Sequence, residues 1–133
     1  MLIWITGNDF IKASKFLEEI EDEYAIPAMR SLAGVVGNYD LIDSSTQISN
    51  CRSLSYRLHI VCIRGFVGGL IEGGSPNTQD YVALNFCNDP ILQDDERSNC
   101  YQEALWLLSV YLSKDRYEDV CKKLNGTYRK FCG

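Results

Sequence analysis

The sequence has little of what most metal, cofactor and membrane sites require. Its 133 residues include a single histidine, His59, and no apolar run approaches the roughly 20 residues that a membrane-spanning helix needs. No two cysteines are separated by only two to four residues, so the usual zinc-ligand spacing is absent. We therefore expect no metal site, no cofactor and no membrane span.

Basic residues are also few. Lysine and arginine number 13 against 18 aspartates and glutamates, which gives a net charge of -5. The densest basic clusters are the pairs Lys122-Lys123 and Arg129-Lys130. Because affinity for a phosphate backbone depends on clustered lysine and arginine, the sequence argues against a nucleic-acid partner. A hydrophobic fraction of 46% is typical of a globular protein.

Strand-like alternation of apolar and polar residues is missing, whereas apolar residues recur at three- and four-residue steps. This periodicity predicts an all-α protein in which short helical hairpins stack as a small repeat-like array. We expect one domain over residues 1–133. Residues 1–50 would form N-terminal helices and a loop, and residues 51–133 would form cysteine-paired helical repeats.

The N-terminal part predicts two helices. The first follows Asn8 or Asp9, either of which is a good helix N-cap, and extends to Tyr24. An acidic run over residues 18–23 would then crowd its C-terminal end, where negative charge is unfavourable. Pro27 is expected to open a second, shorter helix over residues 28–36.

A loop is predicted over residues 38–50, followed by a helix from Cys51. That helix contains Gly65 and the pair Gly68-Gly69. Glycine weakens a helix interior, so these positions are expected to break it. They also suggest close packing against a neighbouring helix, which the absence of a side chain permits.

Cysteine is the residue type that is plentiful. The six cysteines form three intervals: Cys51 and Cys62, Cys87 and Cys100, Cys121 and Cys132. Residues eleven apart on one helix lie about 16 Å apart along its axis, whereas a disulfide needs Cα atoms within about 7 Å. A pair therefore bonds within its interval only where the chain turns.

Two of the intervals contain an evident turn. Asp89-Pro90 lies between the second pair of cysteines, and Asn125-Gly126 lies between the third. Residues 52–61, between the first pair, contain no helix breaker. Local pairing is favoured, most clearly for the last two intervals, but the other connectivities of six cysteines stay open.

The first cysteines of successive intervals are 36 and 34 residues apart, a period typical of paired-helix solenoids. Cys100-Tyr101 opens an apolar helical run. On these features the chain from Cys51 to Cys132 resembles prokaryotic cysteine-stapled αα-hairpin repeat proteins, the disulfide-bearing relatives of tetratricopeptide and Sel1-like repeats. The resemblance implies a binding or scaffold role in an exported protein.

The sequence therefore favours a non-catalytic module whose partner is another protein. Trp106 lies one position off the apolar face of its helix, and Trp4 lies in the apolar start of the chain. Either tryptophan is a candidate partner contact, with buried packing as the default expectation. Arg97 and Arg129 each precede the second cysteine of an interval by three residues. We expect them at equivalent positions of successive hairpins, where each caps a helix end, pairs with a carboxylate or contacts a partner.

Two alternatives stay open. One is a thiol enzyme or redox protein in which Cys62 is the nucleophile and His59, on the same helical face, is its base. The other is a purely structural module of a surface assembly. Because cystines persist in oxidising compartments, we expect an extracytoplasmic or secreted protein. The ending on Phe131-Cys132-Gly133 suggests a piece of a longer exported chain.

Overall fold

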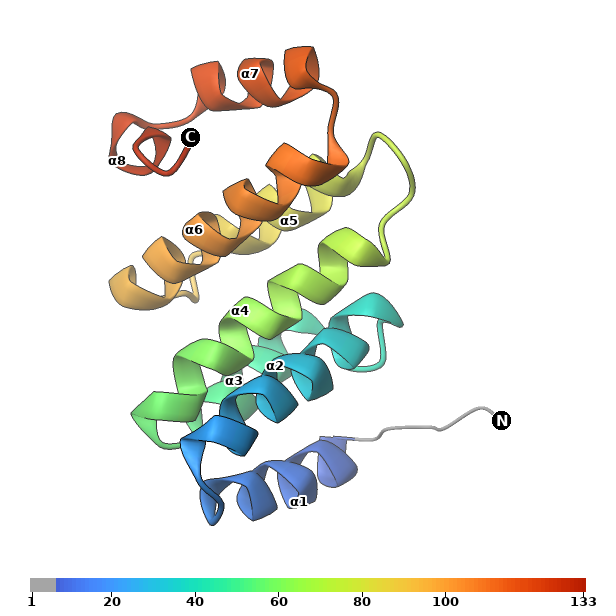
Figure 1. The fold of residues 1–133 in the computed structure, drawn as a ribbon, viewed down its shortest axis with the longest axis vertical. Coiled ribbons are helices and arrows are strands. Elements are labelled where there is room, and N and C mark those ends of the chain that lie inside the picture. Colours follow the sequence, from blue (N-terminus) through green and yellow to red (C-terminus); the bar gives the residue numbers. More distant parts are fainter. Residues whose placement is uncertain (1–6) are drawn as a thin grey trace.

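The computed structural model describes residues 7–133, which form eight helices and no strand (Figure 1). In chain order the helices are α1 (Gly7–Glu18), α2 (Asp22–Asn38), α3 (Ser44–Arg52), α4 (Tyr56–Glu72), α5 (Gln79–Cys87), α6 (Asp94–Tyr111), α7 (Lys114–Lys123) and α8 (Gly126–Arg129). The all-α prediction is confirmed over this range. Trp4 lies outside it.

Consecutive helices pair into hairpins that stack in sequence order (Figure 1). Helices α2, α4 and α6 lie side by side in one layer, α3 and α5 lie behind them, and α7 with α8 covers the end of the array beyond α6. Apolar side chains from successive hairpins share one buried cluster, which includes Phe10, Met29, Phe66 and Leu105. The prediction of stacked helical hairpins is therefore confirmed.

The first helix ends earlier than predicted, because the chain turns within the acidic run. α1 ends at Glu18 and α2 begins at Asp22. Asp22 and Glu23 therefore occupy the first turn of α2, where negative side chains stabilise the helix by interacting with the positive end of its dipole. Pro27 lies inside α2 rather than at its start. Glu18 has a capping role, since its carboxylate accepts hydrogen bonds from the Ser55 N–H (3.1 Å) and hydroxyl (2.5 Å) at the start of α4.

The predicted loop over residues 38–50 is wrong for most of its length. Asp43 caps α3, accepting hydrogen bonds from the Thr46 hydroxyl (2.7 Å) and the Thr46 N–H (3.1 Å). These bonds stabilise the charged carboxylate and lower the pKa of Asp43. With its first turn closed in this way, α3 extends through residues that are mostly polar.

The predicted break in the helix after Cys51 also lies elsewhere. The chain turns at residues 53–55, between α3 and α4, and α4 then continues without interruption through Gly65 and Gly68. Serines at both ends of this turn are the signal that sequence reasoning missed, because serine favours turns and N-cap positions. The turn brings Cys51 and Cys62 to a Cα separation of 5.5 Å.

The three disulfides join Cys51 to Cys62, Cys87 to Cys100 and Cys121 to Cys132. Each lies within one hairpin, so the locally paired connectivity favoured by the sequence is the one observed. The four sulfurs of the first two bonds are fully buried. Cys121 and Cys132, at the end of the array, are partly exposed.

Glycines bring α2 and α4 unusually close together. A Cβ atom on Gly65 would lie 2.6 Å from the Arg30 carbonyl oxygen, and one on Gly37 or Gly69 would lie closer still to the opposing backbone. The prediction that glycines of the helix after Cys51 permit close packing is confirmed at Gly65 and Gly69, and Gly37 has the same role without having been predicted. Nowhere in residues 7–133 does a helix combine the length and the apolar character needed to cross a membrane.

Candidate binding groove

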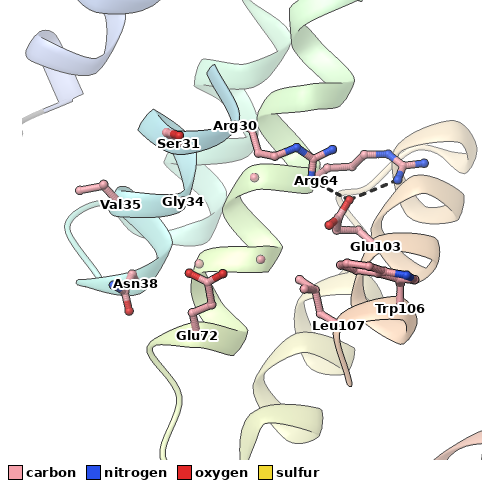
Figure 2. Close-up of a pocket in the computed structure, with 13 residues that line it drawn as sticks. Arg30, Ser31, Gly34, Val35, Asn38, Arg64, Glu72, Glu103, Trp106 and Leu107 are labelled. Carbon is pink, nitrogen blue, oxygen red and sulfur yellow. Dashed lines mark hydrogen bonds and ion pairs between the residues drawn. The ribbon is translucent and has the colours of Figure 1, made fainter. Parts of the chain in front are cut away.

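A groove of about 490 Å³ lies over the outer face of α4 (Figure 2). Helices α2 and α6 form its two walls. Because three neighbouring hairpins contribute to it, the groove exists only in the stacked array. Its volume lies within the range of about 300–1,000 Å³ that is usual for ligand sites.

Two glycines keep the groove open without being required by helix packing. A Cβ atom on Gly68 would lie 3.4 Å from Leu107 Cδ1, and one on Gly34 would lie 3.6 Å from the Gly65 carbonyl oxygen. Both are ordinary van der Waals distances, unlike those at Gly65 and Gly69. Alanine would stabilise the helix at either position and would fit there. The contact between α2 and α4 therefore does not explain why these two positions are glycine.

One end of the groove is cationic. The Glu103 carboxylate, whose side chain is only 8% exposed, lies 2.9 Å from Arg30 Nη1 and 3.3 Å from Arg64 Nη1 (Figure 2). Arg64 is held further by Asn99 and Gln102, to whose side-chain oxygens it donates hydrogen bonds of 2.6 Å and 2.7 Å. One carboxylate thus serves two guanidinium groups, which leaves one positive charge. The Arg30 side chain remains 46% exposed.

The remainder of the groove contains apolar side chains and Ser31, and it ends on an acid. Trp106, 65% exposed, lies beside the arginines, with Leu107 next to it on α6, and Val35 lies on the α2 side (Figure 2). At the far end lie Glu72, which is exposed, and Asn38. The groove therefore has an indole surface in its middle and opposite charges at its two ends.

Of the predicted partner contacts within residues 7–133, Trp106 lies in the groove, and Arg97 and Arg129 do not. The Arg97 Nη2 donates to the carbonyl oxygens of Asp89 (2.9 Å) and Leu92 (3.0 Å), eight and five residues earlier. Arg129 donates to the equivalent carbonyl oxygens of the next hairpin, from Nε to Cys121 (3.2 Å) and from Nη2 to Leu124 (2.7 Å). The predicted equivalence as helix-end caps is confirmed, whereas a role for either arginine in partner contact stays a prediction.

Cys62 and His59 do not form a nucleophile–base pair. The Cys62 sulfur is bonded to Cys51 and is buried, and free cysteines are absent from residues 7–133. His59 Nε2 instead lies 2.6 Å from Glu96 Oε2, on α6. This geometry gives no support to thiolate chemistry at Cys62.

Glu96 is the most heavily bonded buried charge in the described chain. Its carboxylate accepts two hydrogen bonds from Arg52 (2.6 Å and 2.9 Å) and one from the Gln93 N–H (2.8 Å), besides the contact with His59. Burial raises the pKa of Glu96, but the bonds from Arg52, Gln93 and His59 outweigh burial and lower it to about 2. The cluster joins the second hairpin to the third, and its partners are all internal.

Sequence reasoning missed Arg30, Arg64 and Glu103, because they meet only when α2, α4 and α6 are assembled. The one usable sequence signal was the cost of glycine in a helix interior: Gly34 and Gly68 lie there without a packing reason. Within residues 7–133 no group of three or more histidine, cysteine, aspartate or glutamate side chains is arranged to hold a metal ion.

Comparison of the chain with protein-family models, with curated proteins and with solved structures gives no match. Function is therefore inferred from the geometry of the groove.

Proposed function

We propose that this protein is a non-catalytic protein-binding module and that the groove between α2 and α6 is its binding face. The observation that carries the proposal is Trp106, an indole that is 65% exposed beside the groove and next to two arginines. Tryptophan and arginine are the residues most enriched among binding hot spots. An open groove across three helices suits a segment of a partner protein, because the rest of the partner's chain can continue out of the groove at both ends.

The proposed compartment is oxidising and extracytoplasmic. Three disulfides within one small chain support it, because such bonds are rare where thiols are kept reduced. We also propose that the chain is a cysteine-stapled αα-hairpin repeat protein. The shared contacts of Arg97 and Arg129 in successive hairpins support this.

A displayed library of random dodecapeptides, selected on the oxidised protein, tests the proposal. Selected peptides are expected to lose at least about tenfold in affinity when Trp106→Ala is introduced, the scale of a hot-spot residue. Val110→Ala is the matched control, because Val110 lies one turn further along α6, is 69% exposed and is outside the groove.

Circular dichroism melts of both variants check that the fold is intact. If selection yields only peptides that bind Trp106→Ala as well as the original protein, the groove is not the binding face. The alternative of a purely structural module would then stand.

A further inference from the structure

We infer that the groove takes an extended peptide segment that carries a carboxylate side chain and a basic side chain about four residues apart, with apolar residues between them. The inference rests on the proposed function and specifies the partner's chemistry. It follows from the unlike charges at the two ends of the groove.

The carboxylate belongs at the end formed by Arg30 and Arg64. Glu103 neutralises only one of these two guanidinium groups, and it contacts both through a single oxygen, Oε1. Arg64 is largely committed to Asn99, Gln102 and Glu103, whereas Arg30 has one ion pair and a side chain that is 46% exposed. A second carboxylate is therefore the group that this end lacks, and the planar fork of arginine suits it.

The basic side chain belongs at the other end, next to Glu72. Glu72 is exposed, and the charge at this end of the groove is negative. Arg64 and Glu72 lie eight residues apart on α4, about 12 Å along the helix axis. An extended chain rises about 3.3 Å per residue, so an acid and a base four residues apart span the same distance.

Between the two charges the groove contains the apolar side chains of Trp106 and Leu107, and α4 has no side chain at Gly68. The middle of the segment would therefore lie close to the α4 backbone, with an apolar side chain against Trp106. A segment with one acid and one base is neutral overall. It is consequently not repelled by a protein whose net charge is -5, as a uniformly acidic peptide would be.

Sequencing the selected dodecapeptides and measuring double-mutant cycles test the inference. Peptides that depend on Trp106 should be enriched in an acid and a lysine or arginine three to five residues apart. For one such peptide, Arg30→Gln and replacement of the peptide's aspartate by asparagine should each weaken binding about tenfold, the scale of a close interfacial charge pair. The two changes together should weaken it no further than either alone.

Glu72→Gln and replacement of the peptide's lysine by glutamine form the second cycle, with the same expectation. Lys114→Gln on α7, outside the groove, is the charge-matched control for Arg30→Gln. Trp106-dependent peptides without charge enrichment, or cycles that are additive, would overturn the inference and leave the proposed function in place. Absence of any Trp106-dependent peptide would overturn both.

Discussion

At the scale of single residues, the helical glycines divide into two classes with opposite expected effects. We predict that Gly68→Ala and Gly34→Ala raise the free energy of unfolding by about 0.5–1 kcal/mol each, because alanine favours the helix and both positions have room for a methyl group. Urea unfolding followed by far-UV circular dichroism measures the change.

Gly65→Ala and Gly69→Ala are the matched comparisons on the same helix. Their Cβ atoms would overlap the backbone of α2, so both variants should be less stable than the original protein. Equal effects at all four positions would contradict the distinction between packed and open glycines. If Gly68→Ala also weakened peptide binding, the presence of glycine at position 68 would be explained by binding in the groove rather than by stability.

The buried carboxylate of Glu96 predicts a pH dependence of stability. Its pKa is lowered from 4.5 to about 2 in the folded protein, so the unfolded chain binds more protons between these values. The resulting stabilisation is complete above about pH 4.5 and is lost as the pH falls towards 2. A shift of this size corresponds to about 3 kcal/mol.

Glu96→Gln should remove most of that dependence, and it should lower stability at pH 7 because Arg52 loses its buried partner. Urea titrations between pH 2 and pH 6 compare the two proteins. Some slope should remain in the variant, since the lowered pKa of Asp43 acts in the same direction. An unchanged slope would mean that another group is responsible.

Some residue roles were accessible from the sequence, and others were not. Arg97 and Arg129 were placed correctly because they lie at a fixed distance from cysteines within their own hairpins. Helical periodicity placed Trp106 at the border of its apolar face, but buried packing was the default expectation, and the structure shows the side chain exposed. The groove itself was not predictable, because Arg30 and Glu103 are 73 residues apart and meet only through the stacking of three hairpins.

At the scale of helices, proline and capping residues marked some boundaries correctly and not others, since Pro27 lies inside α2 and Asp9 inside α1. α5 ends before Asp89-Pro90, the turn predicted between the second pair of cysteines. The turn between α3 and α4 was missed because it lacks glycine and proline and depends on Glu18, from a distant helix, to cap α4. A local sequence pattern cannot predict a helix cap that comes from a residue in another hairpin.

The last hairpin should separate from the others under mild reduction. We predict that low concentrations of dithiothreitol open Cys121–Cys132 first, because a thiolate must reach a sulfur to attack it and this pair alone is partly exposed. Alkylation under native conditions, followed by peptide mass spectrometry, identifies the labelled cysteines. In denaturant, where all six are accessible, the order should disappear.

Simultaneous labelling of all six cysteines under native conditions would instead mean that the hairpins open together. The contact expected to loosen with the last hairpin is the stack of Tyr101 on Tyr128, whose ring centroids are 4.1 Å apart. That contact joins α6 to α8.

At the scale of the whole molecule, the disulfides should contribute a large share of stability. Each closes a loop of about a dozen residues, for which chain entropy gives roughly 3 kcal/mol. The net stability of a typical domain is only about 5–15 kcal/mol. Full reduction should therefore lower the melting temperature by tens of degrees in thermal melts followed by circular dichroism. An unchanged melting temperature would mean that the cysteines act only as buried apolar residues.

Because every disulfide lies within a hairpin, the covalent links follow the chain without joining one hairpin to another. A pulling force applied between the two ends would therefore separate the stacked hairpins without breaking a covalent bond. The residues enclosed by each disulfide would not be stretched, because the disulfide would bear the force in their place. Those segments span sequence separations of 11, 13 and 11 residues. At about 3.5 Å per extended residue, reduction should lengthen the fully stretched chain by on the order of 100 Å. The length of the protein under tension would therefore depend on whether its three disulfides are oxidised or reduced.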